Sequence, residues 1–509
     1  MKYALPVLLA AGLVVFTASA PADERPNIVL IMCDDMGFSD IGCYGGEIQT
    51  PNIDRLAEEG MRFTQFYNCA KCTTTRASIV TGLHPRRGGG GLLRQNMVTT
   101  GEVLRAAGYH TCLSGKWHLG RGDTTHPYKR GFDEYYGLLD GCCNFFNPVQ
   151  PDPPYKGGRV RTFGHNDKYV KEFPDDYYTT DAFSDHAAKM IRQYAKGDKP
   201  FFVHVCYTAP HYPMHARPED VAKYKGKYAA GWDKLREARH KRQIEMGLID
   251  PKWKLPGRDG GTPAWEDEKN KEYEDLRMAV YAAMIDSMDQ GIGRILKAVE
   301  ESGEKENTLV MFLSDNGGCA ENPGGTVTSR IPGPKEYYVA VGRPWAYAQN
   351  TPFRRYKAWV HEGGVATPLV ARWPKVVKPG TITRQVGHII DLMPTFVEMA
   401  KTEYPKEFNG REIIPCEGKS LMPVLQGRQR EAHDTICWEW AGNRAVLQGK
   451  WKLVYDKELR RWELFDLEAD RTETSDLAKG QPDRVEKMIE TWNNWAKRCG
   501  LRTDSKRKK

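Results

Sequence analysis

Four side chains with oxygen donors stand in two pairs along the sequence, and each pair directly follows an apolar run. Asp34 and Asp35 follow the first run, and Asp315 and Asn316 follow the second. Carboxylate and amide oxygens suit calcium or magnesium, whereas zinc favours nitrogen and sulfur ligands. We therefore expect these four residues to hold one divalent cation that prefers oxygen.

A second group of side chains is basic and consists of Arg76, Lys116 and Lys357. Lysine and arginine around a divalent cation would hold an anionic group and stabilise the charge that develops on its oxygens. His118 and His211 would add two imidazoles at the same place. This combination predicts an enzyme that transfers a sulfuryl or a phosphoryl group.

The nucleophile of such a reaction should lie at the start of a helix near the cation. The segment 72–82 begins with Cys72 and can continue as a buried helix, whose N-terminal end would favour an oxyanion. The alternative is that Cys72 is only a small apolar side chain of that helix. Cys69 and Cys72 also form a C-x-x-C pair, which alone could be half of a zinc site or a redox pair, but a second such pair is missing.

Apolar runs of strand length precede most of these polar residues. The strand-length runs lie at 28–32, 111–114, 201–205 and 309–313. Amphipathic helical patterns lie between them, at 51–60, 99–108 and 284–303. Buried strands that alternate with helices predict an α/β fold with a large, mostly parallel sheet flanked by helices. Ligands bind beyond the carboxyl ends of the strands in such a sheet, so four strands would bring these side chains to one rim.

Composition and charge narrow the class of protein. The chain has 509 residues, of which 40% are hydrophobic and 11% aromatic, and this excludes a single small module and a disordered chain. The formal charge of +8 suits anionic ligands but is too small to predict nucleic-acid binding. Twelve cysteines do not make a disulfide scaffold in a chain of this length, although an exported protein could form some bridges among Cys33, Cys43, Cys69, Cys112 and Cys206.

Three parts of the chain differ in character. Residues 1–22 combine a basic start, a short apolar run and small residues near Ala20, which predicts a cleaved signal peptide and a periplasmic or secreted protein rather than an uncleaved membrane anchor. Residues 23–430 form the expected catalytic domain, with a charged surface excursion at about 212–275. Residues 431–509 contain short apolar runs, a helical pattern and a basic tail, which predicts a smaller α+β subdomain with an antiparallel sheet.

The sequence also suggests which segments surround the pocket that would hold the substrate at this rim of the sheet. We expect the excursion 212–275, the loop at 320–350 and the C-terminal sheet to form its walls. Within the excursion, residues 234–246 are expected to be helical. Asp391 precedes a helical pattern and is interpreted as a helix cap rather than a catalytic group.

Cys72-x-x-x-Arg76, followed by Ala-Ser-Ile-Val-Thr-Gly, resembles the signature of the formylglycine-dependent (type I) sulfatases of the alkaline-phosphatase superfamily, and in particular their arylsulfatase-like members. The resemblance extends from about residue 25 to 480. Further motifs match in order at 26–35, 115–120, 209–211, 314–317, 351–364, 443–446 and 451–453. Thr74 stands where the family's maturation signal usually carries Pro or Ala.

The resemblance implies an alkaline-phosphatase-like fold and the hydrolysis of aryl or carbohydrate sulfate monoesters. A maturase acting on residues 72–76 would oxidise Cys72 to formylglycine, and the hydrate of this aldehyde would be the nucleophile. Calcium would be bound by a hydrate oxygen of residue 72 and by Asp34, Asp35, Asp315 and Asn316.

The same resemblance assigns roles to the basic residues. Arg76 would stabilise the deprotonated hydrate. Lys116, His211 and Lys357 would bind the sulfate, and either His211 or Lys357 would protonate the departing alcohol. His118 would take the proton from the remaining hydroxyl, which expels sulfate and restores the aldehyde.

Two other functions stay open. A phosphate or phosphonate monoester hydrolase of the same superfamily would need extra ligands for a second metal, where this chain has Lys116 and Lys357. A degenerate, non-catalytic binder of sulfated glycans would not need Cys72, Arg76 or His118. We expect no nucleic-acid partner, and no membrane span once the signal peptide is removed.

Overall fold

The computed structural model describes residues 1, 24–87 and 92–501. The signal peptide expected at 1–22 therefore lies outside the described residues except for residue 1, as does the basic end of the chain from 502 onward. Within the described residues, no helix combines the length and the apolar character needed to cross a bilayer.

One sheet of eleven strands forms the centre of the molecule. From one edge to the other, its strands are β10 (Thr381–Thr383), β2 (Met61–Tyr67), β9 (Ala366–Arg372), β8 (Thr308–Ser314), β1 (Asn27–Cys33), β7 (Phe201–Cys206), β3 (His110–Gly115), β4 (Glu134–Leu138), β5 (Phe163–His165) and β6 (Lys168–Val170), and β11 (Gly387–His388) also pairs with β2. The strands from β8 through β1, β7 and β3 to β4 are parallel, whereas β9, β5 and β6 run antiparallel to their neighbours. The prediction of a large, mostly parallel sheet is confirmed.

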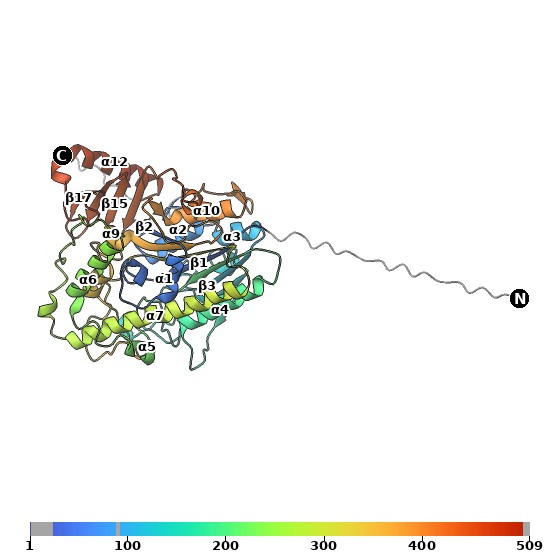
Figure 1. The fold of residues 1–509 in the computed structure, drawn as a ribbon, viewed down its shortest axis with the longest axis horizontal. Helices are drawn as coiled ribbons and strands as arrows, with labels where there is room; N and C mark the ends of the chain where they lie inside the picture. Colours follow the sequence, from blue (N-terminus) through green and yellow to red (C-terminus); the bar gives the residue numbers. More distant parts are fainter. Residues whose placement is uncertain (2–23, 88–91, 502–509) are drawn as a thin grey trace.

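Helices cover both faces of this sheet (Figure 1). One face carries α1 (Pro51–Glu58), α4 (Thr179–Tyr194) and α7 (Lys271–Glu301). The other carries α2 (Cys72–Thr81), α3 (Thr100–Ala106) and α10 (Leu392–Met399). A capping box begins α3, because Thr99 accepts from the amide of Glu102 and the Glu102 carboxylate accepts from the amide of Thr99.

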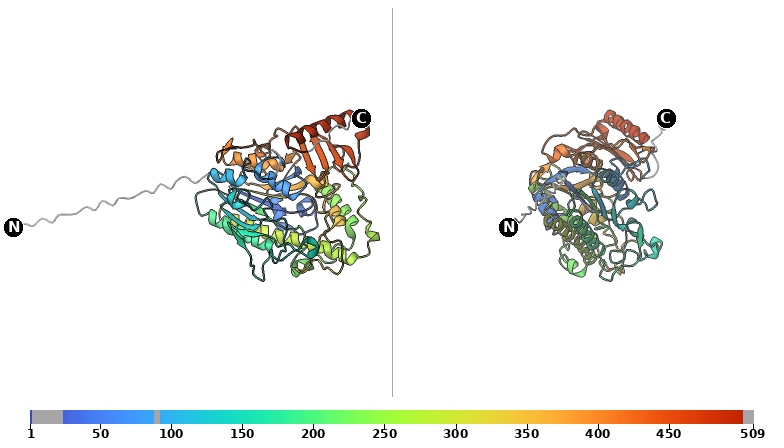
Figure 2. Two further views of the ribbon diagram at one scale, coloured as in Figure 1. Left: turned by 180° about the vertical axis from the view of Figure 1, so that it is seen from behind. Right: turned by 90° about the vertical axis from the view of Figure 1, so that its right-hand side faces the viewer.

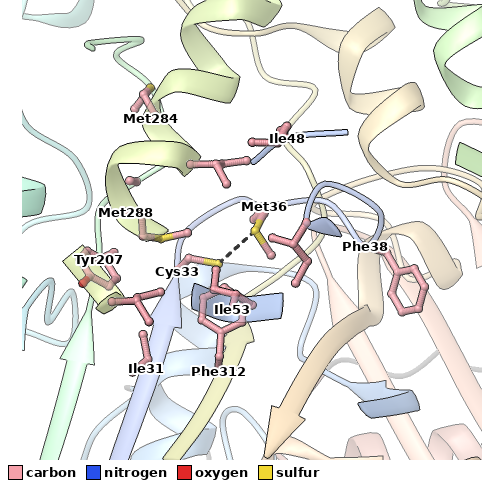
Figure 3. Packing of buried hydrophobic residues seen from close by; sticks show 14 of the residues in the cluster. Ile31, Cys33, Met36, Phe38, Ile48, Ile53, Tyr207, Met284, Met288 and Phe312 are labelled. Carbon is pink, nitrogen blue, oxygen red and sulfur yellow. Dashed lines mark hydrogen bonds between the residues drawn. The ribbon is translucent and has the colours of Figure 1, made fainter. Parts of the chain in front are cut away.

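The central strand β1 shows how an unbroken apolar run serves both faces. Val29 and Ile31 belong to the core that includes α4 and α7, whereas Ile28 and Leu30 belong to the core that includes α2 and α10. Successive side chains of a strand point to opposite faces, so a strand covered on both sides must be apolar throughout. Figure 3 shows Ile31 on the side of the sheet where Met288 of α7 lies.

The C-terminal part of the chain forms a second sheet of four antiparallel strands. They are β14 (Ile436–Trp440), β15 (Asn443–Gln448), β16 (Trp451–Asp456) and β17 (Arg461–Asp466), and α12 (Pro482–Arg498) packs against them at one end of the molecule (Figure 2). The predicted antiparallel sheet with a final helix is confirmed. The described chain also contains the short pair β12 (Glu407–Phe408) and β13 (Arg411–Glu412), and the helices α5 (Pro218–Ala222), α6 (Gly231–Glu245), α8 (Arg343–Gln349), α9 (Glu362–Val365) and α11 (Met422–Leu425).

The charged excursion contains the expected helix, α6, and most of its charged side chains are exposed as expected, but two arginines of α6 are not. Arg236 and Arg239 on α6 are fully buried. Arg236 donates to three backbone oxygens in the segment 347–353, and Arg239 pairs with the carboxylates of Asp40 (2.6 Å) and Glu47 (2.8 Å). These two guanidinium groups therefore bond to the interior of the protein, where a buried charge needs such partners.

One smaller expectation is wrong, and another is confirmed in part. None of the twelve cysteines, all of which lie in the described residues, forms a disulfide, so the bridges considered among Cys33, Cys43, Cys69, Cys112 and Cys206 are not made. Asp391 is the N-cap residue of α10 without a side-chain bond to that helix, and its side chain forms a capping box with His388 on the 3-10 turn Ile389–Asp391. Its carboxylate accepts from the amide of His388 (2.9 Å) and from the side chains of Arg430 (2.7 Å) and His433 (2.7 Å).

Candidate active site

Four adjacent strands of the sheet end at the predicted site. The parallel strands β1 and β8 pair through their last residues, so Asp34 and Asp315 follow side by side. On the other side of β1, His211 lies in the turn after β7. The amide of Lys116, directly after β3, donates to the last residue of β7 (2.7 Å). These residues are far apart in the sequence, but the sheet places them on one rim.

The carboxylates and the amide of the expected metal set lie close together and are buried. The amide nitrogen of Asn316 donates to Oδ1 of Asp35 (2.8 Å), and the backbone amide of Asp35 donates to Oδ1 of Asp315 (3.2 Å). Oδ1 of Asp34 and Oδ1 of Asn316 are buried oxygens with no hydrogen-bond donor among the described residues. Burial and the neighbouring Asp315 carboxylate raise the pKa of Asp34 to about 6.

The three basic side chains each pair with one of these carboxylates. Nζ of Lys116 lies 2.5 Å from Oδ2 of Asp34, and Arg76 lies 2.9 Å from Oδ2 of Asp315. Arg76 also donates to the backbone oxygen of Lys116 (2.9 Å), which joins the start of α2 to the end of β3. Because all of these groups are buried, the attraction between opposite charges is screened little by water.

Lys357 and His211 both face Asp35. Nζ of Lys357 lies 2.7 Å from Oδ2 of Asp35, and Nε2 of His211 lies 3.3 Å from the same oxygen. Burial alone would raise the pKa of Asp35, but these two neighbours hold that pKa below its usual value. Nδ1 of His211 lies 2.6 Å from the backbone oxygen of Tyr212. Since that oxygen can only accept, Nδ1 carries the proton and Nε2 is directed at the site.

Cys72 is the first residue of α2, as the expected position of the nucleophile requires. Its Sγ lies 3.6 Å from Nδ1 of His118. Burial raises the pKa of the Cys72 thiol, whereas burial and the charges of Lys116 and Arg76 lower the pKa of His118 well below its usual value. The pair is therefore a neutral thiol beside a neutral imidazole, unlike the thiolate of a cysteine nucleophile.

Two residues of the site have backbone angles that side chains usually avoid. Asp35 has φ 66° and His118 has φ 59°, both in the left-handed region. Such a conformation costs a residue other than glycine roughly 1–2 kcal/mol, and it persists only where the surrounding bonds fix it. Asp35 is fixed by its bonds to Lys357 and Asn316.

A cavity of about 450 Å³ opens above these residues. Of the predicted site residues, Cys72, His118 and His211 line it, and the other seven lie buried beneath. The expected walls are largely wrong: the excursion 212–275 and the loop 320–350 contribute only Tyr212 and Glu321, and no described residue after 321 lines the cavity.

The remaining wall comes from residues that the sequence analysis did not single out. They lie after β3 and between β4 and β5, and they are Gly120, Arg121, Leu139, Asp140, Gly141, Cys142, Lys156, Arg159 and Arg161, with Lys71 beside Cys72. The one signal that could have pointed to them is the concentration of basic residues at 156–161. Loops without apolar periodicity otherwise give little indication of where they fold.

Known protein families match most of the chain. The family model described as Sulfatase matches residues 26–402, and the model described as N-sulphoglucosamine sulphohydrolase, C-terminal, matches residues 354–494. An uncharacterized sulfatase of Schizosaccharomyces pombe is 33% identical and covers 94% of this chain and 95% of its own length. The arylsulfatase of Klebsiella aerogenes is 31% identical and covers 84% of this chain and 97% of its own length.

Solved structures agree with this relationship. The crystal structure of Ps i-CgsB in complex with k-i-k-neocarrahexaose has a TM-score of 0.69 and 27% identity, and the alignment covers 93% of each chain. A putative sulfatase from Bacteroides fragilis, at 18% identity and a TM-score of 0.66, shares the fold alone. The fold is alkaline-phosphatase-like, and the chain belongs to the sulfatase family as an enzyme that hydrolyses aryl or carbohydrate sulfate esters.

Proposed function

We propose that this sulfatase works through a formylglycine made from Cys72 and through one calcium ion held by Asp34, Asp35, Asp315 and Asn316. The observation that carries the proposal is the position of Cys72. It begins α2 at the base of the cavity, 3.6 Å from His118, and borders the crowded carboxylates at the ends of β1 and β8. A nucleophile, a proton acceptor and a cation site would thus share one pocket.

The residues present fit a calcium ion. Two buried oxygens, Oδ1 of Asp34 and Oδ1 of Asn316, have no donor among the described residues, and calcium takes oxygen ligands of this kind. Burial and the neighbouring Asp315 carboxylate also raise the pKa of Asp34, and a bound cation at this oxygen would offset both effects. When bound, the ion would polarise the sulfate oxygens and offset the charge that develops on them.

The chemical state of Cys72 favours a modified residue over a free thiol. A protonated, buried thiol is a poor nucleophile. An oxygen-dependent maturase acting on residues 72–76 would instead oxidise Cβ of Cys72 to an aldehyde. The hydrate of this aldehyde would supply one hydroxyl as the nucleophile and a second hydroxyl whose deprotonation releases sulfate.

The other residues would bind, orient and move protons. Arg76, held by Asp315, would stabilise negative charge at residue 72. Lys116 and Lys357 would turn from their carboxylates to the sulfate, and His211 or Lys357 would protonate the departing alcohol. His118 is neutral and lies next to residue 72, so it is suited to accept a proton there.

Sulfate release tests this function. The protein, matured in a host that makes formylglycine, is assayed on 4-nitrophenyl sulfate, a set of carbohydrate sulfates and 4-nitrophenyl phosphate, beside Cys72→Ala. We expect sulfate release by the wild type, little phosphate release, and loss of turnover in Cys72→Ala. Equal sulfate release by both proteins would reject Cys72 as the source of the nucleophile, and faster phosphate release would favour the phosphatase alternative.

We also propose that the signal peptide 1–22 directs export to the periplasm or the medium, and that the mature chain consists of the catalytic domain 23–430 and the subdomain 431–509. The basic start, short apolar run and small residues near Ala20 support the first part. N-terminal sequencing of the protein from the cell exterior tests it. A retained residue 1 would contradict cleavage.

A further inference from the structure

The cavity above Cys72 is lined by basic side chains that the proposed reaction does not use. They are Lys71, Arg121, Lys156, Arg159 and Arg161, whereas only two carboxylates, Asp140 and Glu321, line the same space. A single sulfate group held at the base of the cavity would not need this excess of positive charge. The charge of the walls therefore requires its own explanation.

The two carboxylates are already matched by neighbours. Glu321 accepts from Lys71 (2.6 Å) and lies 4.0 Å from Lys357, and Asp140 pairs with Arg159. Arg161 is likewise paired, with Asp152 outside this cavity. These pairs leave little net charge on their part of the wall.

Lys156 and Arg121 differ from the other basic residues. In the part of the chain that the structure describes, no carboxylate lies within ion-pair distance of either side chain. Nζ of Lys156 lies 5.1 Å from the ring centres of both Tyr212 and Tyr338. Ring faces attract an ammonium group without accepting all of its N–H bonds, so its donors remain available to an anion.

Lys156 is joined to the sulfate end of the cavity through a single aromatic ring. The ring of Tyr212 lies 4.2 Å from the ring of His211, centre to centre. The hydroxyl of Tyr212 donates to Glu321 (2.7 Å), which keeps the ring in place between His211 and Lys156. An anion on Lys156 would thus sit about one sugar or aryl ring away from the sulfate-binding residues.

Arg121 lines the same cavity and stands three residues after His118 in the sequence. One Nη of Arg121 donates to Oγ1 of Thr162 (2.8 Å), and the amide of Thr162 donates to Asp140 (2.6 Å). Gly141, the residue after Asp140, packs closely on the imidazole of His118. A Cβ at position 141 would lie 2.5 Å from an atom of that ring. Arg121 thereby borders the same cavity from the His118 side.

We propose, on the basis of the sulfatase function above, that Lys156 and Arg121 bind a second anionic group of the substrate, a carboxylate or another sulfate. The substrate class is then a sulfate ester of a saccharide that carries at least one further negative charge. A cavity of about 450 Å³ lies within the size range of small-molecule sites and admits such a sugar. Phenyl sulfates with one charge would leave both cations unmatched.

Direct binding tests this proposal without requiring turnover. The full-length Cys72→Ala protein is titrated by calorimetry, in calcium buffer, with galactose 6-sulfate, galactose 2,6-disulfate and galactose 6-sulfate joined to glucuronate. We expect the two doubly charged probes to bind about tenfold more tightly than the singly charged one, with a difference that shrinks as salt rises. The disulfate and the glucuronate show which kind of anion is preferred.

The variants make the assignment specific. In Lys156→Met/Arg121→Met the preference for the second charge should largely disappear, whereas the matched control Lys168→Met/Lys171→Met removes two exposed charges of the nearby β6 hairpin and should keep it. If the double variant has a lower melting temperature than the wild type, the single variant Lys156→Gln replaces it. This single variant is expected to lose part of the preference for doubly charged probes. Equal affinity for all probes, or a preference that survives in Lys156→Met/Arg121→Met, overturns the proposal.

Failure of the catalytic proposal gives a different result. In that case the wild type releases no sulfate from 4-nitrophenyl sulfate, while the preference for doubly charged probes remains. Sulfate release without any such preference rejects the second anion site alone.

Discussion

Nζ of Lys357 lies 2.7 Å from Oδ2 of Asp35, so a lysine from a late loop meets the end of the central strand of the sheet. The C-terminal sheet holds that loop in place. Arg355, two residues before Lys357, donates to the buried carboxylate of Asp456 at the end of β16 (2.5 Å). Since no residue of the C-terminal sheet lines the cavity, this contact is a route by which that sheet can affect the reaction.

Arg355 is therefore predicted to be a positioning residue. Arg355→Ala should lower kcat/KM by about 10- to 100-fold, because small displacements of a group that orients the substrate are costly. Asp456→Asn should cause a similar loss, and the two changes together should cause little more. Steady-state kinetics with melting temperatures provide the measurement, and Lys457→Ala in the same turn is the control. A lower melting temperature with unchanged kcat/KM would limit Arg355 to a structural role.

The proposed modification of Cys72 can be tested directly. Peptide mass spectrometry of residues 72–76 from the native host should show formylglycine in place of cysteine, despite Thr74. The activity of Cys72→Ala should fall by at least about a thousandfold, as expected when a nucleophile is removed. Cys69→Ala, which alters the other cysteine of the C-x-x-C pair, should remain active. An active preparation in which residue 72 is entirely a thiol would refute the mechanism.

Calcium is expected to stabilise the fold as well as support activity. The crowded carboxylates around Asp34 repel each other, so chelation should lower the melting temperature, and calcium at about 100 times its dissociation constant should restore about 2.7 kcal/mol. Calorimetry with and without chelator measures the effect. Asp34→Asn should lose the response to calcium, whereas Asp123→Asn, at an exposed position, should keep it. A melting temperature indifferent to calcium in the wild type would argue against the site.

Asp391 should contribute stability that depends on pH. Burial alone would raise the pKa of Asp391, but its bonds to His433 and Arg430 lower it from 3.8 to about 2. A carboxylate with a lowered pKa stabilises the fold above its unfolded value near 4, and this contribution is lost as pH falls toward 2. Asp391→Asn should therefore cost about 2 kcal/mol at pH 7 and progressively less below pH 4. Urea unfolding at several pH values tests this, and a cost that is the same at pH 2.5 and pH 7 would contradict it.

The main sheet and the polar rim could be predicted because apolar runs mark buried strands. Runs such as 28–32 and 309–313 became β1 and β8, and the parallel pairing of these strands brings Asp34 and Asp315 together. A residue directly after such a strand has its position set by the sheet, which is why scattered motifs converge.

Other features of the fold and the site depend on contacts that cannot be predicted from the sequence. The sequence of α6 has the charged composition of a solvated helix. Its buried arginines are identified only by their partners, such as Asp40. The cavity wall at 156–161 lies in a loop between strands, where no periodicity fixes direction. The pair between Arg355 and Asp456 joins two parts of the chain whose relative placement follows from neither segment alone.

The burial of Cys72 has a consequence for how active molecules are made. The side chain is only 2% exposed at the base of the cavity, so a converting enzyme would have little access to it in the folded chain. The proposed conversion would then take place while the chain is still being synthesised or is still extended. A molecule that folds before conversion would be correctly folded but inactive. The specific activity of a preparation would therefore depend on the rate of conversion relative to the rate of folding.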